Sequence, residues 1–132
     1  MEIRKTWNQD LYLKALRFAA EAHNGQKVPG TELPYIMHVV SVAMEVMAAI
    51  CIEGVEDPDL AVQCALLHDT IEDTEVTGHD ITLIFGAEVA AGVKALTKES
   101  GLPGEMRMKD SIYRILRSEE HTSELQSRQS IS

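Results

Sequence analysis

The segment that most constrains the fold is residues 60–67, LAVQCALL, where one glutamine interrupts an otherwise apolar run. Asp57 and Pro58 precede it, and an aspartate followed by proline is typical of a helix cap and a first helical position. A helix that is apolar on nearly every side has to be covered by other elements all round. We therefore predict a central buried helix over residues 60–68, with other segments packed around it.

Helical spacing also dominates the rest of the sequence. In residues 11–22, apolar side chains recur at intervals of three and four, and Asn8 or Asp10 is placed to cap that helix. A short acidic turn is expected after residue 68. No internal repeat and no alternating strand pattern occurs in the sequence, so the predicted fold class is all-α, a single helical bundle. Its remaining helices are predicted over residues 35–52, 80–85, 86–96 and 106–116.

Composition places the chain among ordinary globular proteins. Its 132 residues fit one domain, and 45% hydrophobic with 25% charged residues excludes wholesale disorder. A net charge of −9 argues against nucleic acid or an anionic membrane as a partner. Cys51 and Cys64 form neither a metal-like spacing nor a disulfide framework, which favours a reducing compartment. No apolar run approaches about 18 residues and no signal peptide is evident, so we expect a cytoplasmic protein without a membrane span.

The last residues differ in composition. From Arg117 onward Ser, Glu, Gln and Arg predominate, and the apolar period stops. A disordered polar terminus has such a composition. However, residues 117–127, RSEEHTSELQS, also resemble the translation of a widely used DNA-sequencing adapter. We therefore expect a native domain over residues 1–116 and a non-native polar tail over residues 117–132, and we assign no function to His121.

The strongest chemical signal is ALLHDTIEDT, residues 65–74, in which an apolar helix ends in a His68–Asp69 pair followed by Glu72 and Asp73. Residues four apart share a helix face, so His68 is expected beside Glu72, and Asp69 beside Asp73. Imidazole and carboxylate together form a common ligand set for a divalent transition metal, and carboxylates nearby can position water or take its proton. The alternative is a solvated acidic helix end, an arrangement that the helix dipole opposes.

A second signal is PYIMHVVSVA, residues 34–43, which puts His38 in the first turn of an apolar helix. A lone histidine on such a helix is more often a packed core residue than a ligand. Here the His68–Asp69 pair is an incomplete ligand set that needs a further side chain. We predict that His38, His68 and Asp69 converge on one site, although thirty residues separate the two histidines.

Together these motifs resemble those of the HD-domain phosphohydrolases. Within them the chain looks like the (p)ppGpp hydrolase branch, which comprises the hydrolase domain of Rel/SpoT homologues and the small alarmone hydrolases. AHNGQKVPGTELPYIMH, residues 22–38, resembles the branch's AHxGQ…G…PYIxH segment, and FGAEVAAGVKALTK, residues 85–98, resembles its FGxxVAxxVxxLTK helix. The resemblance covers residues 11–116, nearly all of the predicted native domain.

The resemblance implies an HD-type helical bundle around one divalent metal, typically Mn²⁺. By residue-by-residue correspondence, His38, His68 and Asp69 are metal ligands. Glu72 and Asp73 match the branch's ED pair and would be the catalytic residues that serve the attacking water.

The resemblance also implies two substrate-binding positions. Lys27 falls in the loop that supplies basic contacts, although the family's richer basic stretch is reduced here to Lys27-Val28-Pro29. Tyr35 matches a position that lines the same pocket. His23, in the same segment, is expected to be structural.

The family's fourth ligand is an aspartate in a K-x-A-D-R-x-x-N-like motif on a later helix, and this sequence contains no such motif. Asp110 lies in MRMKDSIYRIL, which resembles the segment before that helix, so we do not assign it as the ligand. A native domain cut near residue 116 accounts for the missing motif. We expect weaker metal binding, little hydrolase activity, and an uncovered apolar surface that favours a homo-oligomer.

The predicted function is that of a metal-dependent phosphohydrolase, guanosine-3′,5′-bis(diphosphate) 3′-pyrophosphohydrolase, which converts (p)ppGpp to GDP or GTP and pyrophosphate. The small-molecule partner is then a nucleotide, whose negative charge the metal and Lys27 offset locally. Two alternatives stay open: another HD phosphohydrolase acting on a nucleotide or on NADPH, and a non-catalytic nucleotide-sensing domain. The Glu72–Asp73 pair disfavours a general nucleotidase but does not decide on NADPH.

Overall fold

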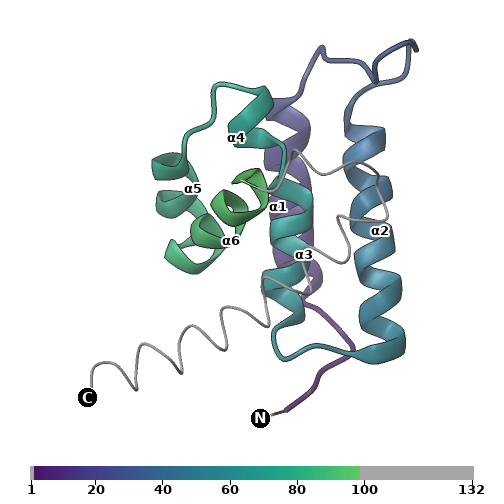
Figure 1. The fold of residues 1–132 in the computed structure, drawn as a ribbon, viewed down its shortest axis with the longest axis vertical. Helices are drawn as coiled ribbons and strands as arrows, with labels where there is room; N and C mark the ends of the chain where they lie inside the picture. Colours follow the sequence, from purple (N-terminus) through teal and green to yellow (C-terminus); the bar gives the residue numbers. More distant parts are fainter. Residues whose placement is uncertain (1, 99–132) are drawn as a thin grey trace.

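The computed structural model describes residues 2–98, and in this part of the chain it is an all-α bundle (Figure 1). The described residues contain no strand, only isolated β-bridges that join Arg4 to Val55 and Lys27 to Pro34. The all-α prediction is therefore confirmed. The predicted helix at 106–116, Asp110 and the tail at 117–132 lie outside the described residues. The helices are α1 (Gln9–Ala22), α2 (Ile36–Glu53), α3 (Pro58–Leu67), α4 (Thr70–Asp73), α5 (Gly78–Phe85) and α6 (Ala87–Lys98).

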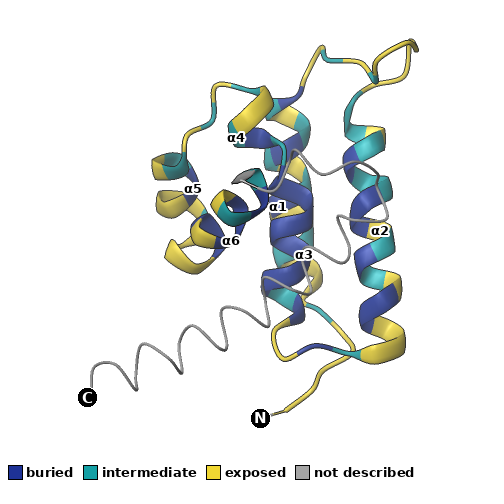
Figure 2. Ribbon diagram, in the orientation of Figure 1, coloured by how far each residue is buried: buried dark blue, intermediate teal, exposed yellow. Residues whose placement is uncertain are grey.

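Helix α3 is the centre of the bundle, as its apolar sequence predicts. It packs against α1, α2 and α6, and nine of its ten residues are buried, Asp59 excepted. Figure 2 shows α3 as an almost continuous buried segment between α1 and α2. Its C-terminal end therefore lies inside the protein rather than in solvent.

Side-chain caps fix the starts of three helices. The Asn8 side chain accepts hydrogen bonds from the backbone N–H groups of the first turn of α1, so Asn8 and not Asp10 is its cap. Asp57 caps α3 with Pro58 at its start, as predicted. At α5, Thr77 and Asp80 form a reciprocal capping box.

One helix is missing from the sequence-based prediction. The segment after Asp69, expected to be an acidic turn, forms the one-turn helix α4, whose backbone bonds run from Asp73 N–H to Asp69 C=O and from Thr74 N–H to Thr70 C=O. A helix of four residues is unstable on its own because nucleation is costly. The i,i+4 spacing of His68, Asp69, Glu72 and Asp73 is compatible with such a turn, but its order depends on the packing around it.

Helix α2 carries an apolar surface on both sides. Its buried face, which includes Val39, Val42 and Val46, packs into the core, whereas Met44 and Ile52 are exposed. By length and composition alone, 18 residues at a mean hydropathy of 1.8, it could cross a membrane, and a third of these residues are buried. The expectation that no apolar run approaches about 18 residues is thus wrong for α2. The core helix of a soluble protein also meets this criterion of length and hydropathy.

A close contact between Gly92 of α6 and Cys64 of α3 gives a test of the packing. A Cβ at position 92 would lie 2.5 Å from Cys64 Sγ, and Cys64 is itself buried. We expect G92A to lower the free energy of unfolding by about 1–3 kcal/mol through overpacking, despite the better helix propensity of alanine. Urea denaturation would measure the change.

The double variant C64A/G92A is the matched control. It removes the sulfur that the new methyl group meets, so it should recover most of the stability that G92A loses. If G92A were as stable as the unaltered chain, α3 and α6 could not be in this contact.

Candidate functional site

The site begins with the buried end of α3. A helix leaves its last carbonyl groups without intrahelical partners, and burial makes unpaired carbonyls costly. Here His68 Nδ1 lies 2.6 Å from Ala65 O, and Thr70 Oγ1 donates to Leu67 O at 2.8 Å. A carbonyl oxygen only accepts hydrogen bonds, so His68 carries its proton on Nδ1 and presents Nε2 to its other neighbours.

Two further potential ligand atoms lie near His68 Nε2, one from Asp69 and one from His38. His68 Nε2 lies 3.0 Å from Asp69 Oδ2, and His38 Nε2, from the first turn of α2, lies 3.9 Å from the same oxygen. One ligand atom from each of the three side chains lies within 4.8 Å of the others. The predicted convergence of His38, His68 and Asp69 is therefore confirmed, across thirty residues of sequence.

This arrangement fits a divalent metal ion. Two imidazole nitrogens and one carboxylate oxygen are a donor set suited to transition metals, and waters can complete an open coordination shell. The hydrogen bond from His68 Nδ1 to Ala65 O is the outer contact that metal-ligating histidines usually make, because it fixes the ring and the tautomer. His68 is buried, while His38 and Asp69 are partly exposed, so the site is open on one side.

Asp69 and His68 shift each other's pKa. Burial alone would raise the pKa of Asp69, but the hydrogen bond and charge of His68 and the hydrogen bond from Tyr35 outweigh it and lower that pKa to about 2. Burial likewise opposes the charged form of His68, yet its contacts with Asp69 raise its pKa above the ordinary 6.5. Asp69 is consequently ionised near neutral pH.

Asp73 and Glu72 lie in α4, one turn beyond the ligand pair. Partial burial and the neighbouring charges of Asp69 and Glu72 raise the pKa of Asp73. The expected closeness of Asp69 and Asp73 is confirmed by the Asp73 N–H···O=C Asp69 bond of 2.9 Å and by this electrostatic interaction. Both side chains are exposed, and their role toward water stays a prediction.

Tyr35 faces the candidate metal ligands. Its hydroxyl donates a hydrogen bond of 2.6 Å to Asp69 Oδ2, the oxygen that also contacts His68. Burial and this bond to an anion raise the pKa of Tyr35 well above its usual value, so the phenol stays protonated. The predicted substrate-binding role is untested, whereas the contact with Asp69 is a feature that sequence patterns did not indicate.

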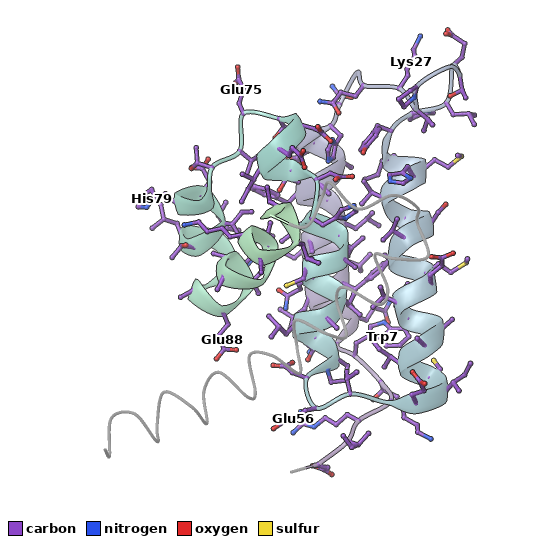
Figure 3. All side chains as sticks on the ribbon, viewed as in Figure 1. Trp7, Lys27, Glu56, Glu75, His79 and Glu88 are labelled. Atoms are coloured by element: carbon purple, nitrogen blue, oxygen red, sulfur yellow. The ribbon has the colours of Figure 1, made fainter. Side chains whose placement is uncertain are left out.

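Lys27 lies in the loop between α1 and α2, away from the helical bundle (Figure 3). Its Nζ forms a salt bridge of 2.8 Å with Glu32 in the same loop, and both side chains are largely exposed. Exposed pairs of this kind are weak, so a bound polyanion could compete for the lysine. A substrate contact by Lys27 stays a prediction.

Gln26 belongs to the site and was missed by sequence reasoning. Its Nε2 donates to Asp73 O at 2.8 Å, and its Oε1 lies 2.9 Å from Nδ1 of the buried His23. His23 also contacts the ring of Tyr35 in a tilted arrangement, with ring centroids 4.8 Å apart, which agrees with a structural role. Gln26 lies in a loop without periodicity, and only its place in the AHNGQ segment could have drawn attention to it.

The HD-domain family model matches residues 15–129, so this chain belongs to the HD-domain family. It is related to the MESH1 and SpoT (p)ppGpp hydrolases. It is 38% identical over 101 residues to guanosine-3′,5′-bis(diphosphate) 3′-pyrophosphohydrolase MESH1 of Danio rerio. The aligned residues cover 76% of this chain and 54% of that protein.

Two further comparisons agree. A GTP pyrophosphokinase of Myxococcus xanthus is 36% identical over 91 residues, 69% of this chain but 11% of that protein. A solved structure, described as a metazoan ortholog of SpoT that hydrolyzes ppGpp and plays a role in starvation responses, matches with a TM-score of 0.64. Its sequence identity is 25%, over 82% of this chain and 66% of that one. The chain thus spans about half the length of the curated MESH1 relatives that it matches.

The protonation of His68 predicts how metal affinity depends on pH. A metal ion needs the neutral imidazole, so the proton that Asp69 stabilises on His68 has to leave before Nε2 can bind. Because the pKa of His68 is raised, affinity should still be increasing at a pH where an unperturbed histidine is already neutral. Calorimetric titration with Mn²⁺ at several pH values would measure this.

H38A and H68A should weaken Mn²⁺ binding at every pH, while H79A, which alters an exposed histidine on the far side of α5, should not (Figure 3). Affinity that stays constant between acidic and alkaline pH would contradict the assignment of His68.

Proposed function

We propose that this domain carries the active site of a metal-dependent (p)ppGpp 3′-pyrophosphohydrolase. The observation that carries the proposal is the cluster of His38, His68 and Asp69, whose ligand atoms lie within 4.8 Å of one another beside the carboxylate of Asp73. The names of the MESH1 relatives and of the SpoT-like solved structure supply the substrate class. The metal is proposed to be Mn²⁺.

The reaction is a hydrolysis of the 3′-diphosphate. The oxygen of a water molecule bonds to the phosphorus attached to the ribose 3′ oxygen, and the bond between that phosphorus and the 3′ oxygen breaks. Pyrophosphate leaves with the water oxygen, and the ribose oxygen takes up a proton, which gives GDP or GTP. When bound, the metal supplies Lewis-acid polarisation of the phosphate and makes water easier to deprotonate.

The chain's own residues have distinct tasks in this proposal. His38, His68 and Asp69 hold the metal, and Glu72 and Asp73 orient the water and accept its proton. The raised pKa of Asp73 makes it a better proton acceptor than an ordinary aspartate, because a more basic carboxylate binds the proton more strongly. Lys27 and Tyr35 are proposed substrate contacts from the α1–α2 loop.

A direct assay of two nucleotides tests the proposed substrate. The 132-residue chain and a chain extended after residue 116 with a helix that carries the family's K-x-A-D-R-x-x-N motif would be compared with ppGpp and with NADPH in Mn²⁺. The extended chain should release pyrophosphate from ppGpp, and the 132-residue chain should show little activity because a negatively charged ligand is missing.

Each other outcome of this assay leads to a different conclusion. Turnover of NADPH without turnover of ppGpp would overturn the proposed substrate. Equal activity of the two chains would show that another carboxylate fills the fourth position, with Asp110 the first to replace. No metal-dependent turnover of either nucleotide by the extended chain would favour a nucleotide-sensing domain.

The catalytic pair is tested by E72Q and D73N in the extended chain. Each replacement keeps the shape of the side chain but removes a base, so the turnover number should fall by about 10²–10⁴-fold. Mn²⁺ affinity should change little. The matched control is E75Q, the same change on an exposed side chain that points away from the bundle in Figure 3. A variant that loses its metal but keeps normal turnover per bound metal would show that its residue is a ligand instead.

A further inference from the structure

The loop between α1 and α2 is closed on itself. Tyr35 N–H donates to Gln26 O at 2.8 Å, and Val28 N–H donates to Leu33 O at 2.8 Å. Gly25 and Gly30 permit the tight path, because both have a positive φ that other residues rarely adopt. The closure sets Gln26 and Tyr35 side by side at the base of the loop, next to the candidate metal site.

Each of these two residues reaches a different acidic residue of the site. The Tyr35 hydroxyl donates to the side chain of Asp69 at 2.6 Å, whereas the Gln26 side chain donates to the backbone carbonyl of Asp73 at 2.8 Å. Asp69 is the carboxylate of the ligand cluster, and Asp73 is the last residue of α4. The loop therefore contacts the metal-binding carboxylate and the water-activating segment through separate hydrogen bonds.

His23 contacts both Gln26 and Tyr35. Asp73 O can only accept, so Gln26 Nε2 is the donor and Gln26 Oε1 has to accept from His23 Nδ1–H. The other ring nitrogen, Nε2, is buried and has no hydrogen-bond partner among the described residues. The imidazole thus orients Gln26 through one nitrogen and contacts the ring of Tyr35 in a tilted arrangement, with 4.8 Å between centroids.

We propose that Tyr35 and Gln26 are positioning residues, Tyr35 for the carboxylate of Asp69 and Gln26 for the α4 segment that carries Asp73. Asp69 Oδ2 has to face His68 and His38 at once, and a hydrogen bond from Tyr35 fixes the carboxylate rotation that makes this possible. α4 is too short to be stable alone, and Gln26 anchors its last carbonyl. The proposal rests on the metal site of the proposed function but not on the identity of the substrate.

The first test is Mn²⁺ binding by Y35F, measured by calorimetry on the 132-residue chain without nucleotide. Removing one hydroxyl should raise the dissociation constant by about 10–100-fold, the usual cost of losing an outer contact to a metal ligand. E32Q is the matched control, because it alters an exposed side chain of the same loop, whose salt bridge is with Lys27 and not with Asp69 or Asp73. Its Mn²⁺ affinity should equal that of the unaltered chain.

The second test separates the two positioning roles by amide hydrogen exchange. Q26M should speed exchange at Asp73 and Thr74, whose N–H groups bond to Asp69 O and Thr70 O within α4, and Y35F should leave them unchanged. If Q26M does not fold, Q26E replaces it: a glutamate still accepts from His23 Nδ1 but offers no donor to Asp73 O.

Three results would overturn the proposal: unchanged Mn²⁺ affinity in Y35F, equal loss of affinity in Y35F and E32Q, or no saturable Mn²⁺ binding by the unaltered chain. A higher KM for nucleotide in Y35F with unchanged Mn²⁺ affinity would make Tyr35 a substrate contact only. Because no nucleotide is present in the titration, a failure to hydrolyse ppGpp leaves this result standing, and the reverse also holds.

Discussion

The rest of the structure depends on how the buried C-terminus of α3 pairs its carbonyl groups. No water reaches them, so side chains from the next residues have to donate, and His68 and Thr70 do so to Ala65 and Leu67. The same hydrogen bond between His68 Nδ1 and Ala65 O that completes the helix end also sets the His68 tautomer and directs Nε2 toward Asp69. Folding and metal chemistry therefore share one requirement, a histidine immediately after an entirely buried helix.

Charge at the site is unbalanced without a cation. Asp69, Glu72 and Asp73 lie within one segment, and partial burial together with the charges of Asp69 and Glu72 raises the pKa of Asp73. Hydrogen bonds from His68 and Tyr35 keep Asp69 ionised in spite of partial burial. A polyphosphate would be repelled by this cluster and by the net charge of −9, and a divalent cation at the site would offset that repulsion locally.

Local sequence signals were enough for the helices that carry their own caps and periodicity. LAVQCALL predicted the burial of α3, Asp57-Pro58 its start, and the incomplete His68–Asp69 pair the need for His38. The segment of α4 was expected to be an acidic turn, and the contact of Gln26 with Asp73 was not predicted, because it joins residues 47 apart in the sequence. Such contacts depend on tertiary packing and leave no periodic trace in the sequence.

The contacts among His38, His68 and Asp69 also show which of these candidate metal ligands depends on helix packing for its position. His68 and Asp69 are adjacent in the chain, and their 3.0 Å contact is set locally, whereas His38 lies 3.9 Å from Asp69 and is brought there by helix α2. Val39 and Val46 fix one face of α2, and the opposite side leaves Met44 and Ile52 exposed. A shift of α2 along or across α3 would move His38 relative to Asp69, together with Tyr35 at the start of the same helix. The metal affinity of this domain is therefore coupled to the contacts of α2.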